Sequence, residues 1–305
     1  MKLVFQIILK LTFLASLVPY LVSEKLYQKY QLRINPQVED SLYSNGKEMG
    51  KVNRKLINEA SGLAHSRMFD NMLYTHNDSG GLPVIYKMDS TGKIIGQIRL
   101  NGVSNRDWED MAIGPGPEKG KSYVYVGDIG DNQEKAPSIK VFRFEEPDEH
   151  QDTTVVVPEV LELTYPDGPK DAETLMVDPW NGDLLILSKR DSSNVLYKLK
   201  DGANQNGKAE LEKVLKLPIT MSVAGDISPD GREIIIKNYW VVYHWYRKEG
   251  ESIEAALSRS PVQLPYVPEP QGEALAFSRD GKSYFSLSEE RFRIKPVLYQ
   301  YYRKQ

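Results

Sequence analysis

One short phrase recurs five times along this chain of 305 residues, and it limits the possible folds more than any other feature. The copies are Ser61-Gly62-Leu63-Ala64, Glu109-Asp110-Met111-Ala112, Glu173-Thr174-Leu175-Met176, Gly225-Asp226-Ile227-Ser228 and Glu273-Ala274-Leu275-Ala276. Their third residues are separated by 48, 64, 52 and 48 positions, a spacing typical of four-stranded blades and too long for most helical repeats. We therefore predict an all-β chain folded as a single β-propeller, in which each copy marks the innermost strand of one blade.

The strands between the copies predict five blades and a particular way of closing the ring. The second blade is expected to end in an outer strand over 155–164, whereas the fifth copy is followed by only two strands, 282–287 and 297–302. The missing outer strand is expected from 50–57. The last blade then combines strands from the N-terminal and C-terminal parts of the chain, which leaves no open sheet edge. Six blades are the alternative, which would require further strands within 25–43.

Composition narrows the classes of function. The 39 Lys and Arg residues are nearly balanced by 42 Asp and Glu residues, for a net charge of −3, so we expect no nucleic-acid partner. The chain has no cysteine, which excludes disulfides and thiolate metal sites.

The N-terminal residues have the pattern of an export signal. Residues 1–23 combine an early lysine with an apolar stretch, interrupted by Lys10, and end in Ser23, a small residue suited to cleavage. The uninterrupted part, 11–22, is short for a membrane span, so no stable span is expected after cleavage. We expect a secreted, periplasmic or extracellular protein, with a leader segment over 24–49 and the propeller over 50–305.

Acidic residues recur at the start of the repeated phrase and predict a metal site. Glu109, Glu173 and Glu273 share one repeat position, Asp226 lies one residue further on, and Asp128 belongs to the loop after the next strand. In a closed ring these carboxylates would meet at one mouth of the axis, where they repel one another unless a cation or a proton compensates. Oxygen ligands favour calcium, whereas zinc would favour His or Cys. In the alternative interpretation, the carboxylates accept backbone N–H bonds from neighbouring blades and hold the ring in register without metal.

Several longer motifs carry a resemblance to a known family. They are Trp108-Glu109-Asp110-Met111-Ala112, Gly127-Asp128-Ile129-Gly130-Asp131-Asn132, Ala172-Glu173-Thr174-Leu175 and Gly272-Glu273-Ala274-Leu275-Ala276. With these motifs the chain resembles an uncharacterised family of secreted β-propeller proteins, loosely similar to propellers of the esterase-like phytase and NHL types. The resemblance covers nearly all of the mature chain and implies fold and export, but it brings no catalytic residue and no reaction.

Two functions are compatible with this pattern. The first is a non-catalytic binding or surface module that holds calcium or a small polar ligand, phosphate-bearing or carbohydrate, at its axial mouth. The alternative is a metal-dependent phosphate or carboxylic ester hydrolase, in which the acidic ring holds the ion. Asp128 or His76 would then activate water, while Lys189 and Lys237 would stabilise developing charge. We favour binding, because the sequence shows no clear nucleophile and no strong acid–base pair.

Overall fold

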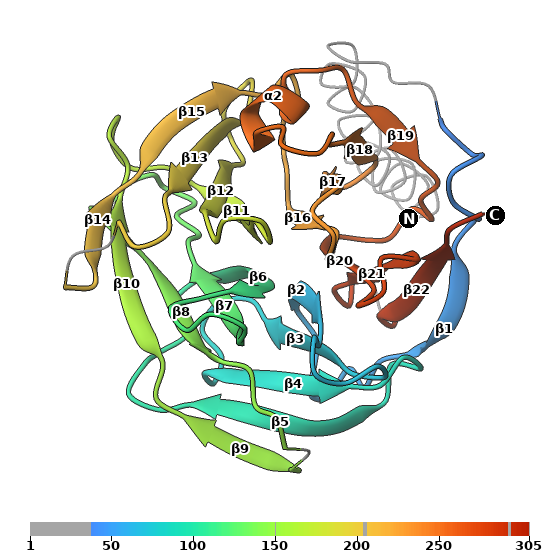
Figure 1. Ribbon diagram of the computed structural model, residues 1–305. Coiled ribbons are helices and arrows are strands. Elements are labelled where there is room, and N and C mark those ends of the chain that lie inside the picture. Colours follow the sequence, from blue (N-terminus) through green and yellow to red (C-terminus); the bar gives the residue numbers. More distant parts are fainter. Residues whose placement is uncertain (1–37, 150, 204–205, 292–293, 305) are drawn as a thin grey trace, which may run out of the picture. The chain divides into compact units, whose positions relative to one another are not determined.

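The described residues of the computed structural model, 38–149, 151–203, 206–291 and 294–304, form five blades around a central axis (Figure 1). Each blade is a sheet with a core of four strands, and neighbouring strands within that core are antiparallel. The structure confirms the five-bladed, all-β propeller and not the six-bladed alternative. The predicted signal segment, 1–23, lies outside the described residues.

The five blades follow one another along the chain. Blade 1 consists of β2 (Ala60–His65), β3 (Leu73–Asn77), β4 (Val84–Met88) and β5 (Ile94–Leu100). Blade 2 consists of β6 (Trp108–Pro115), β7 (Ser122–Asp128), β8 (Ile139–Glu145) and β10 (Glu159–Thr164). Blade 3 consists of β11 (Ala172–Val177), β12 (Leu184–Ser188), β13 (Val195–Leu199) and β15 (Glu212–Lys216). Blade 4 consists of β16 (Ala224–Ile227), β17 (Glu233–Lys237), β18 (Val242–Tyr246) and β19 (Val262–Leu264). Blade 5 consists of β20 (Gly272–Phe277), β21 (Ser283–Ser288), β22 (Val297–Tyr302) and β1 (Lys47–Lys51).

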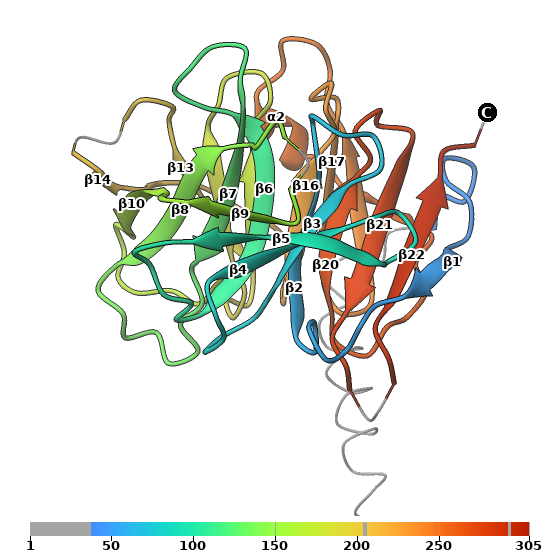
Figure 2. The same cartoon turned by 90° about the horizontal axis from the view of Figure 1, so that it is seen from below.

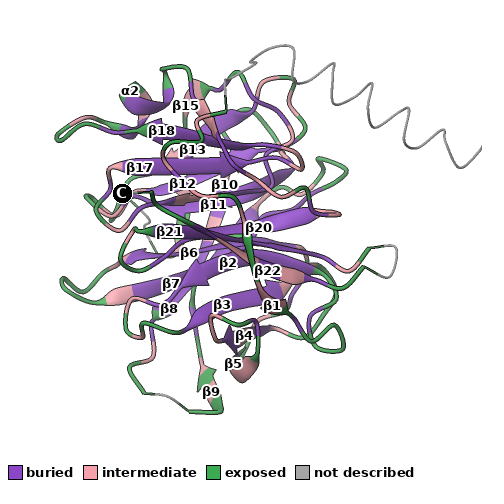
Figure 3. Ribbon diagram, turned by 90° about the vertical axis from the view of Figure 1, so that its right-hand side faces the viewer, coloured by how far each residue is buried: buried purple, intermediate pink, exposed green. Residues whose placement is uncertain are grey.

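The repeated phrase does mark the innermost strand of every blade. The strands β2, β6, β11, β16 and β20 stand next to one another around the axis (Figure 1), and Figure 2 shows four of them, β2, β6, β16 and β20, from below. Their residues are buried almost throughout, because each blade packs both of its faces against neighbouring blades. Figure 3 shows this gradient, with buried inner strands and exposed outer strands such as β9 (Thr153–Val156).

Ring closure occurs as predicted, with a shift in position. The outer strand of blade 5 comes from the N-terminal part of the chain, but it is β1, Lys47–Lys51, and not 50–57. The chain leaves the sheet after Lys51 because Asn53 organises a turn, in which its side chain accepts the N–H of Lys55 at 3.1 Å. Residue Tyr43, within the predicted leader, is fully buried in the core between blades 4 and 5.

Two short strands join neighbouring blades in a way that the sequence did not suggest. The strand expected over 155–164 is divided, because β9 pairs in parallel with β5 of blade 1 before the chain returns to blade 2 as β10. Likewise β14 (Lys208–Glu210) pairs in parallel with β10 before β15 completes blade 3. Both exchanges extend a finished sheet by one strand at its outer edge.

The described residues contain one short helix, α2 (Ile253–Leu257), which begins at the N-cap Ser252. The hydroxyl of Ser252 accepts the N–H of Ala255 at 3.2 Å, which satisfies one of the free donors of the first turn. Within the described ranges, no helix has the length and apolar character needed to cross a membrane.

Candidate functional site

Three glutamates of the repeated phrase meet at the end of the ring where the inner strands begin. Glu109 on β6, Glu173 on β11 and Glu273 on β20 line one cavity of about 340 Å³, which we call the axial cavity. The remaining lining residues are Asp78, Asn132, Lys189, Arg190, Met221, Tyr239, Gln271, Glu289 and Arg291. The axial cavity therefore draws residues from all five blades and their connections.

Irregular strand pairing explains why these glutamates reach the axial cavity. The register between the first two strands shifts at the glutamate in blades 2, 3 and 5. Such a bulge adds an unpaired residue and turns its side chain away from the regular alternation. Blade 4 has no register shift, and Gly225 occupies the equivalent position there.

The axial cavity is unbalanced in charge. Its lining contains five carboxylates and three cationic side chains, which leaves a formal charge of −2 when all are ionised. All three cations are already engaged: Arg190 pairs with Asp171 at 2.5 Å, Arg291 pairs with Glu289 at 3.1 Å, and Lys189 pairs with Glu173. Crowded carboxylates in a desolvated site bind either protons or a cation.

Lys189 connects the glutamates of blades 3 and 5. Its ammonium group forms an ion pair with Glu173 and donates to the hydroxyl of Tyr239 at 3.0 Å. That hydroxyl donates in turn to Glu273 at 2.5 Å. Although burial acts to lower it, the neighbouring Glu173 and Glu273 raise the pKa of Lys189 above its ordinary value, so this lysine is a permanent cation of the axial cavity.

Glu109 is the carboxylate that lacks a direct partner. Within the described ranges its carboxylate makes no hydrogen bond and no ion pair, although the side chain is only 4% exposed. Burial, with the nearby charges of Glu173 and Asp78, raises the pKa of Glu109 well above its ordinary value. A buried carboxylate without a partner is costly, so this group is poised to take up a cation or a proton.

Two triplets of carboxylates share Glu109. Asp78, Asp107 and Glu109 form one, and Glu109, Asp171 and Glu173 form the other. In each triplet, one oxygen atom per residue lies within 4.8 Å of the others. Gly130 leaves space beside them, because a Cβ there would lie 2.5 Å from Asp107 Oδ2 and closer still to Glu109 Oε1.

Other acids around the axial cavity are also shifted toward their protonated forms. Burial raises the pKa of Glu173 to about 8 in spite of Lys189, and one oxygen of Glu173 is buried without a hydrogen-bond partner. Burial and Glu273 raise the pKa of Asp78 to about 7 and that of Glu289 to about 9. In each case burial is the largest cause of the raised pKa, and a neighbouring carboxylate adds to it.

The second position of the repeated phrase has a different role. The carboxylate of Asp226, predicted as a metal ligand, accepts the N–H of Ile227 at 2.8 Å and of Phe277 at 2.7 Å, and it does not line the axial cavity. Asp110 in blade 2 likewise accepts backbone N–H groups of neighbouring inner strands. The alternative interpretation, bracing between blades, therefore describes the aspartates, whereas the glutamates face the axial cavity.

Three further residues singled out from the sequence lie outside the axial cavity lining. Asp128 pairs with Arg106 at 3.1 Å and accepts the N–H of Asp107 at 3.1 Å. His76 is fully buried, where Nδ1 donates to the carbonyl of Asn77 at 3.0 Å, and burial lowers its pKa to about 4. Lys237 is also fully buried, donates to the carbonyl of Gly272, and has a pKa that burial lowers to about 8.

Sequence reasoning missed three residues that complete the site. Tyr239 is one of them, and its hydroxyl bridges Lys189 and Glu273. Asp107 and Asp171 each stand two residues before a glutamate of the repeated phrase, so the shared Asp-x-Glu pattern was the signal that could have found them.

Comparison with known proteins shows the fold and nothing finer. Neither the protein-family models nor the curated proteins compared with this sequence match it. Among solved structures, the PQQ-bound aldose sugar dehydrogenase from Streptomyces coelicolor aligns with a TM-score of 0.52 and 11% identity, over 88% of this chain and 100% of that chain. The WD40 domain of Pan2 from Neurospora crassa aligns with a TM-score of 0.47 and 13% identity, over 88% of this chain and 98% of that one. At such identities the first similarity supports the propeller fold alone.

Proposed function

We propose that this protein is an exported binding module whose axial cavity holds a divalent cation, calcium by the chemistry of the donors, and through it a small polar ligand. The observation that carries the proposal is Glu109, a buried carboxylate without a direct partner that belongs to two carboxylate triplets. Glu173 supports it independently, since one of its oxygens is buried without a hydrogen-bond partner beside the same cavity.

The donor set favours calcium over other common metals. The residues of both triplets offer carboxylate oxygens only, and no His or Cys is among them. Calcium accepts six to eight oxygen ligands in flexible geometry, whereas zinc prefers nitrogen and sulfur. A divalent cation would also balance the formal charge of −2 on the cavity lining. Glu109, Glu173, Asp78, Asp107 and Asp171 are the residues that would hold it.

The cations of the axial cavity suit the ligand more than the metal. Lys189, Arg190 and Arg291 lie along the same lining as the acids, and guanidinium and ammonium groups recognise phosphate or carboxylate oxygens. A small phosphate-bearing ligand would bridge the calcium ion and these cations, and a carbohydrate hydroxyl would complete the calcium coordination in the same place.

Binding is proposed in preference to hydrolysis because of where the candidate catalytic groups lie. His76, Asp128 and Lys237 do not line the axial cavity, which leaves Lys189 alone of the four beside the acids. Metal-dependent ester hydrolysis stays a prediction. Export is likewise part of the proposal, and it rests on the sequence of residues 1–23. Sequencing the N-terminus of the exported protein tests it, with Glu24 as the expected first residue and an intact Met1 as the contrary result.

Calorimetric titration of the mature, metal-stripped protein with calcium tests the central claim. We expect one site, and calcium at a hundred times its Kd should stabilise the fold by about 2.7 kcal/mol. For a domain of this size that is a rise in melting temperature of roughly 5–10 °C.

A pair of variants locates the calcium site. Glu109→Gln should weaken calcium binding by about tenfold or more, because it removes the charged ligand shared by both triplets. Glu249→Gln is the matched control, since that side chain is 84% exposed and pairs with Arg232 far from the acids of the axial cavity. No heat of binding with about 1 mM calcium, or equal affinity in both variants, would remove the metal from this proposal.

A further inference from the structure

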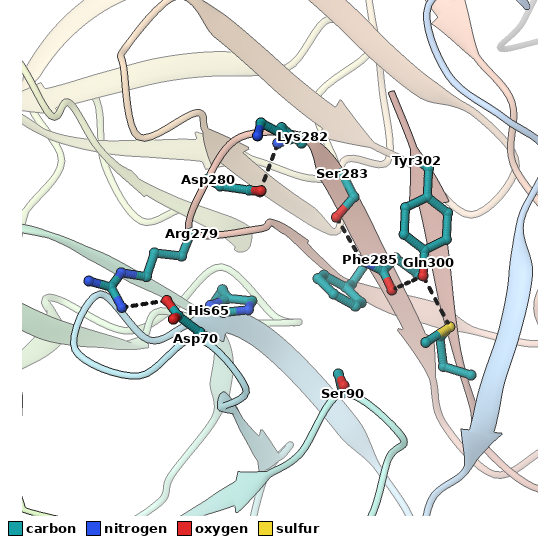
Figure 4. A pocket seen from close by; sticks show the side chains of 11 residues that line it. His65, Asp70, Ser90, Arg279, Asp280, Lys282, Ser283, Phe285, Gln300 and Tyr302 are labelled. Carbon is teal, nitrogen blue, oxygen red and sulfur yellow. Dashed lines mark hydrogen bonds and ion pairs between the residues drawn. The ribbon is translucent and has the colours of Figure 1, made fainter. Parts of the chain in front are cut away.

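A second and larger cavity lies where the first and last blades meet. Its volume is about 710 Å³, and its lining comes from β1, β21, β22 and the β20–β21 turn on one side and from blade 1 on the other. Figure 4 shows this closure cavity, with His65 and Asp70 of blade 1 facing Arg279 and Phe285 of blade 5. His65 is the last residue of β2, so the closure cavity lies toward the opposite end of the inner strands from the glutamates.

Buried polar and aromatic groups form its floor. His65 is 6% exposed, and its Nδ1 donates to the carbonyl of Ser66 at 3.1 Å, which leaves Nε2 as a hydrogen-bond acceptor. Burial lowers the pKa of His65, so the ring is neutral at pH 7. Phe285 is also buried, and its ring centroid lies 5.9 Å from that of His65.

The side of the closure cavity formed by blade 5 combines hydroxyl, amide and aromatic groups. The Gln300 amide donates to the hydroxyl of Ser283 at 2.8 Å, and the hydroxyl of Tyr302 donates to the Gln300 carbonyl oxygen at 2.7 Å. The hydroxyl of Ser283 therefore keeps its own proton for a further acceptor. Tyr302 is 39% exposed and offers part of its ring to solvent.

The rim carries charges of both signs in equal number. Arg279 and Lys282 stand beside Asp70 and Asp280, and Arg279 pairs with Asp70 at 2.6 Å (Figure 4). The lining has no net charge while His65 is neutral, in contrast to the axial cavity. An anionic ligand would face two carboxylates here, and a cationic ligand would face two cations.

We propose that the closure cavity binds a neutral polyhydroxylated ligand, a single sugar ring either free or at the end of a glycan. A sugar needs hydrogen-bond donors and acceptors in close alternation, together with an apolar surface. Arg279, Ser283 and His65 supply the donors and acceptors. The partly exposed ring of Tyr302 supplies the apolar surface. The volume is within the range of small-molecule sites. Because its lining comes from both terminal blades, an occupied site ties the closure of the ring together.

The experiment compares sugars that share a ring and differ in charge. The mature protein, in EDTA to exclude the calcium site, is titrated with D-glucose, D-galactose and D-mannose by saturation-transfer difference NMR. D-glucosamine and D-glucuronate are the charged counterparts of glucose. We expect at least one neutral sugar to bind with a Kd on the order of 1 mM, and the charged counterparts to bind more weakly. A glycan array with neutral and acidic glycans then separates a free sugar from a terminal one.

Variants place the binding in the closure cavity. Arg279→Ala should weaken sugar binding about tenfold and Ser283→Ala about fivefold. Arg232→Ala is the matched control, since it lies in the equivalent turn of blade 4, outside the closure cavity, and should bind as the wild type does. The proposal is overturned if no neutral sugar binds at about 20 mM, if a charged counterpart binds more tightly, or if Arg279→Ala and Ser283→Ala lose no more than the control.

Discussion

Replacing Asp110 by alanine should destabilise the propeller more than any change at its surface. Asp110 is fully buried, and its carboxylate accepts the N–H of Met111 at 2.8 Å, of Leu175 at 3.0 Å and of Gly225 at 3.3 Å. Those three amides belong to β6, β11 and β16, so one side chain ties the inner strands of three blades together.

The magnitude follows from the bonds that would be lost. In Asp110→Ala the buried N–H groups of Met111, Leu175 and Gly225 lose this acceptor, and three such losses at about 1.5 kcal/mol each cost about 4.5 kcal/mol. Burial raises the pKa of Asp110 well above its ordinary value, and removing that buried carboxyl returns part of the cost. We expect a net loss of about 3 kcal/mol in the free energy of unfolding, or roughly 6–12 °C in melting temperature.

Urea unfolding followed by circular dichroism measures this loss. Asp230→Ala is the control, because Asp230 is exposed and the hydrogen bonds to its carboxylate are local, from the hydroxyl of Ser228 and the N–H of Arg232. The control should lose less than about 1 kcal/mol. If Asp110→Ala unfolds within about 0.5 kcal/mol of the wild type, the reasoning that this carboxylate braces three blades is refuted.

Three other predictions concern the axial cavity and the closure of the ring. Gly130→Ala should abolish the rise in melting temperature with calcium, because a Cβ there would occupy space beside the carboxylates. Gly81→Ala is the control and should retain the rise, since a Cβ at residue 81 would lie 3.9 Å from its nearest neighbour. Burial raises the pKa of Asp78 to about 7 and that of Glu173 to about 8, so the folded, calcium-free protein binds more protons than the unfolded chain between about pH 4 and pH 8. Its melting temperature in EDTA should therefore fall as the pH rises from about 5 to about 8.5, and bound calcium should make this fall smaller. A melting temperature that rises over that range would contradict the raised pKa values. A chain that begins at Val52 lacks β1 and exposes the edge of β22, so it should aggregate or lose its cooperative melt, and an unchanged melting temperature would contradict closure by β1.

Much of the fold was readable in the sequence because its determinants are local and repeated. The phrase around Leu63, Met111, Leu175, Ile227 and Leu275 marks every inner strand. Each inner strand is buried on both faces, so the same short apolar run recurs in every blade. The spacing of the copies indicates the number of blades, and the fifth blade takes its outer strand, β1, from the N-terminal part of the chain. The convergence of Glu109, Glu173 and Glu273 follows from the same repeat.

What only the tertiary structure decided depends on contacts between blades. Glu109 and Asp110 are adjacent in sequence, yet one faces the axial cavity and the other accepts N–H groups of two further blades. A bulge in the pairing with β7 and the positions of β11 and β16 separate their roles, and neither is encoded by the spacing of acidic residues. The same holds for His76 and Lys237, whose burial depends on how neighbouring blades close over them. The local sequence pattern therefore specifies which strands form. The closed ring determines which side chains each strand presents to the axis, because every inner strand packs against residues of the neighbouring blades.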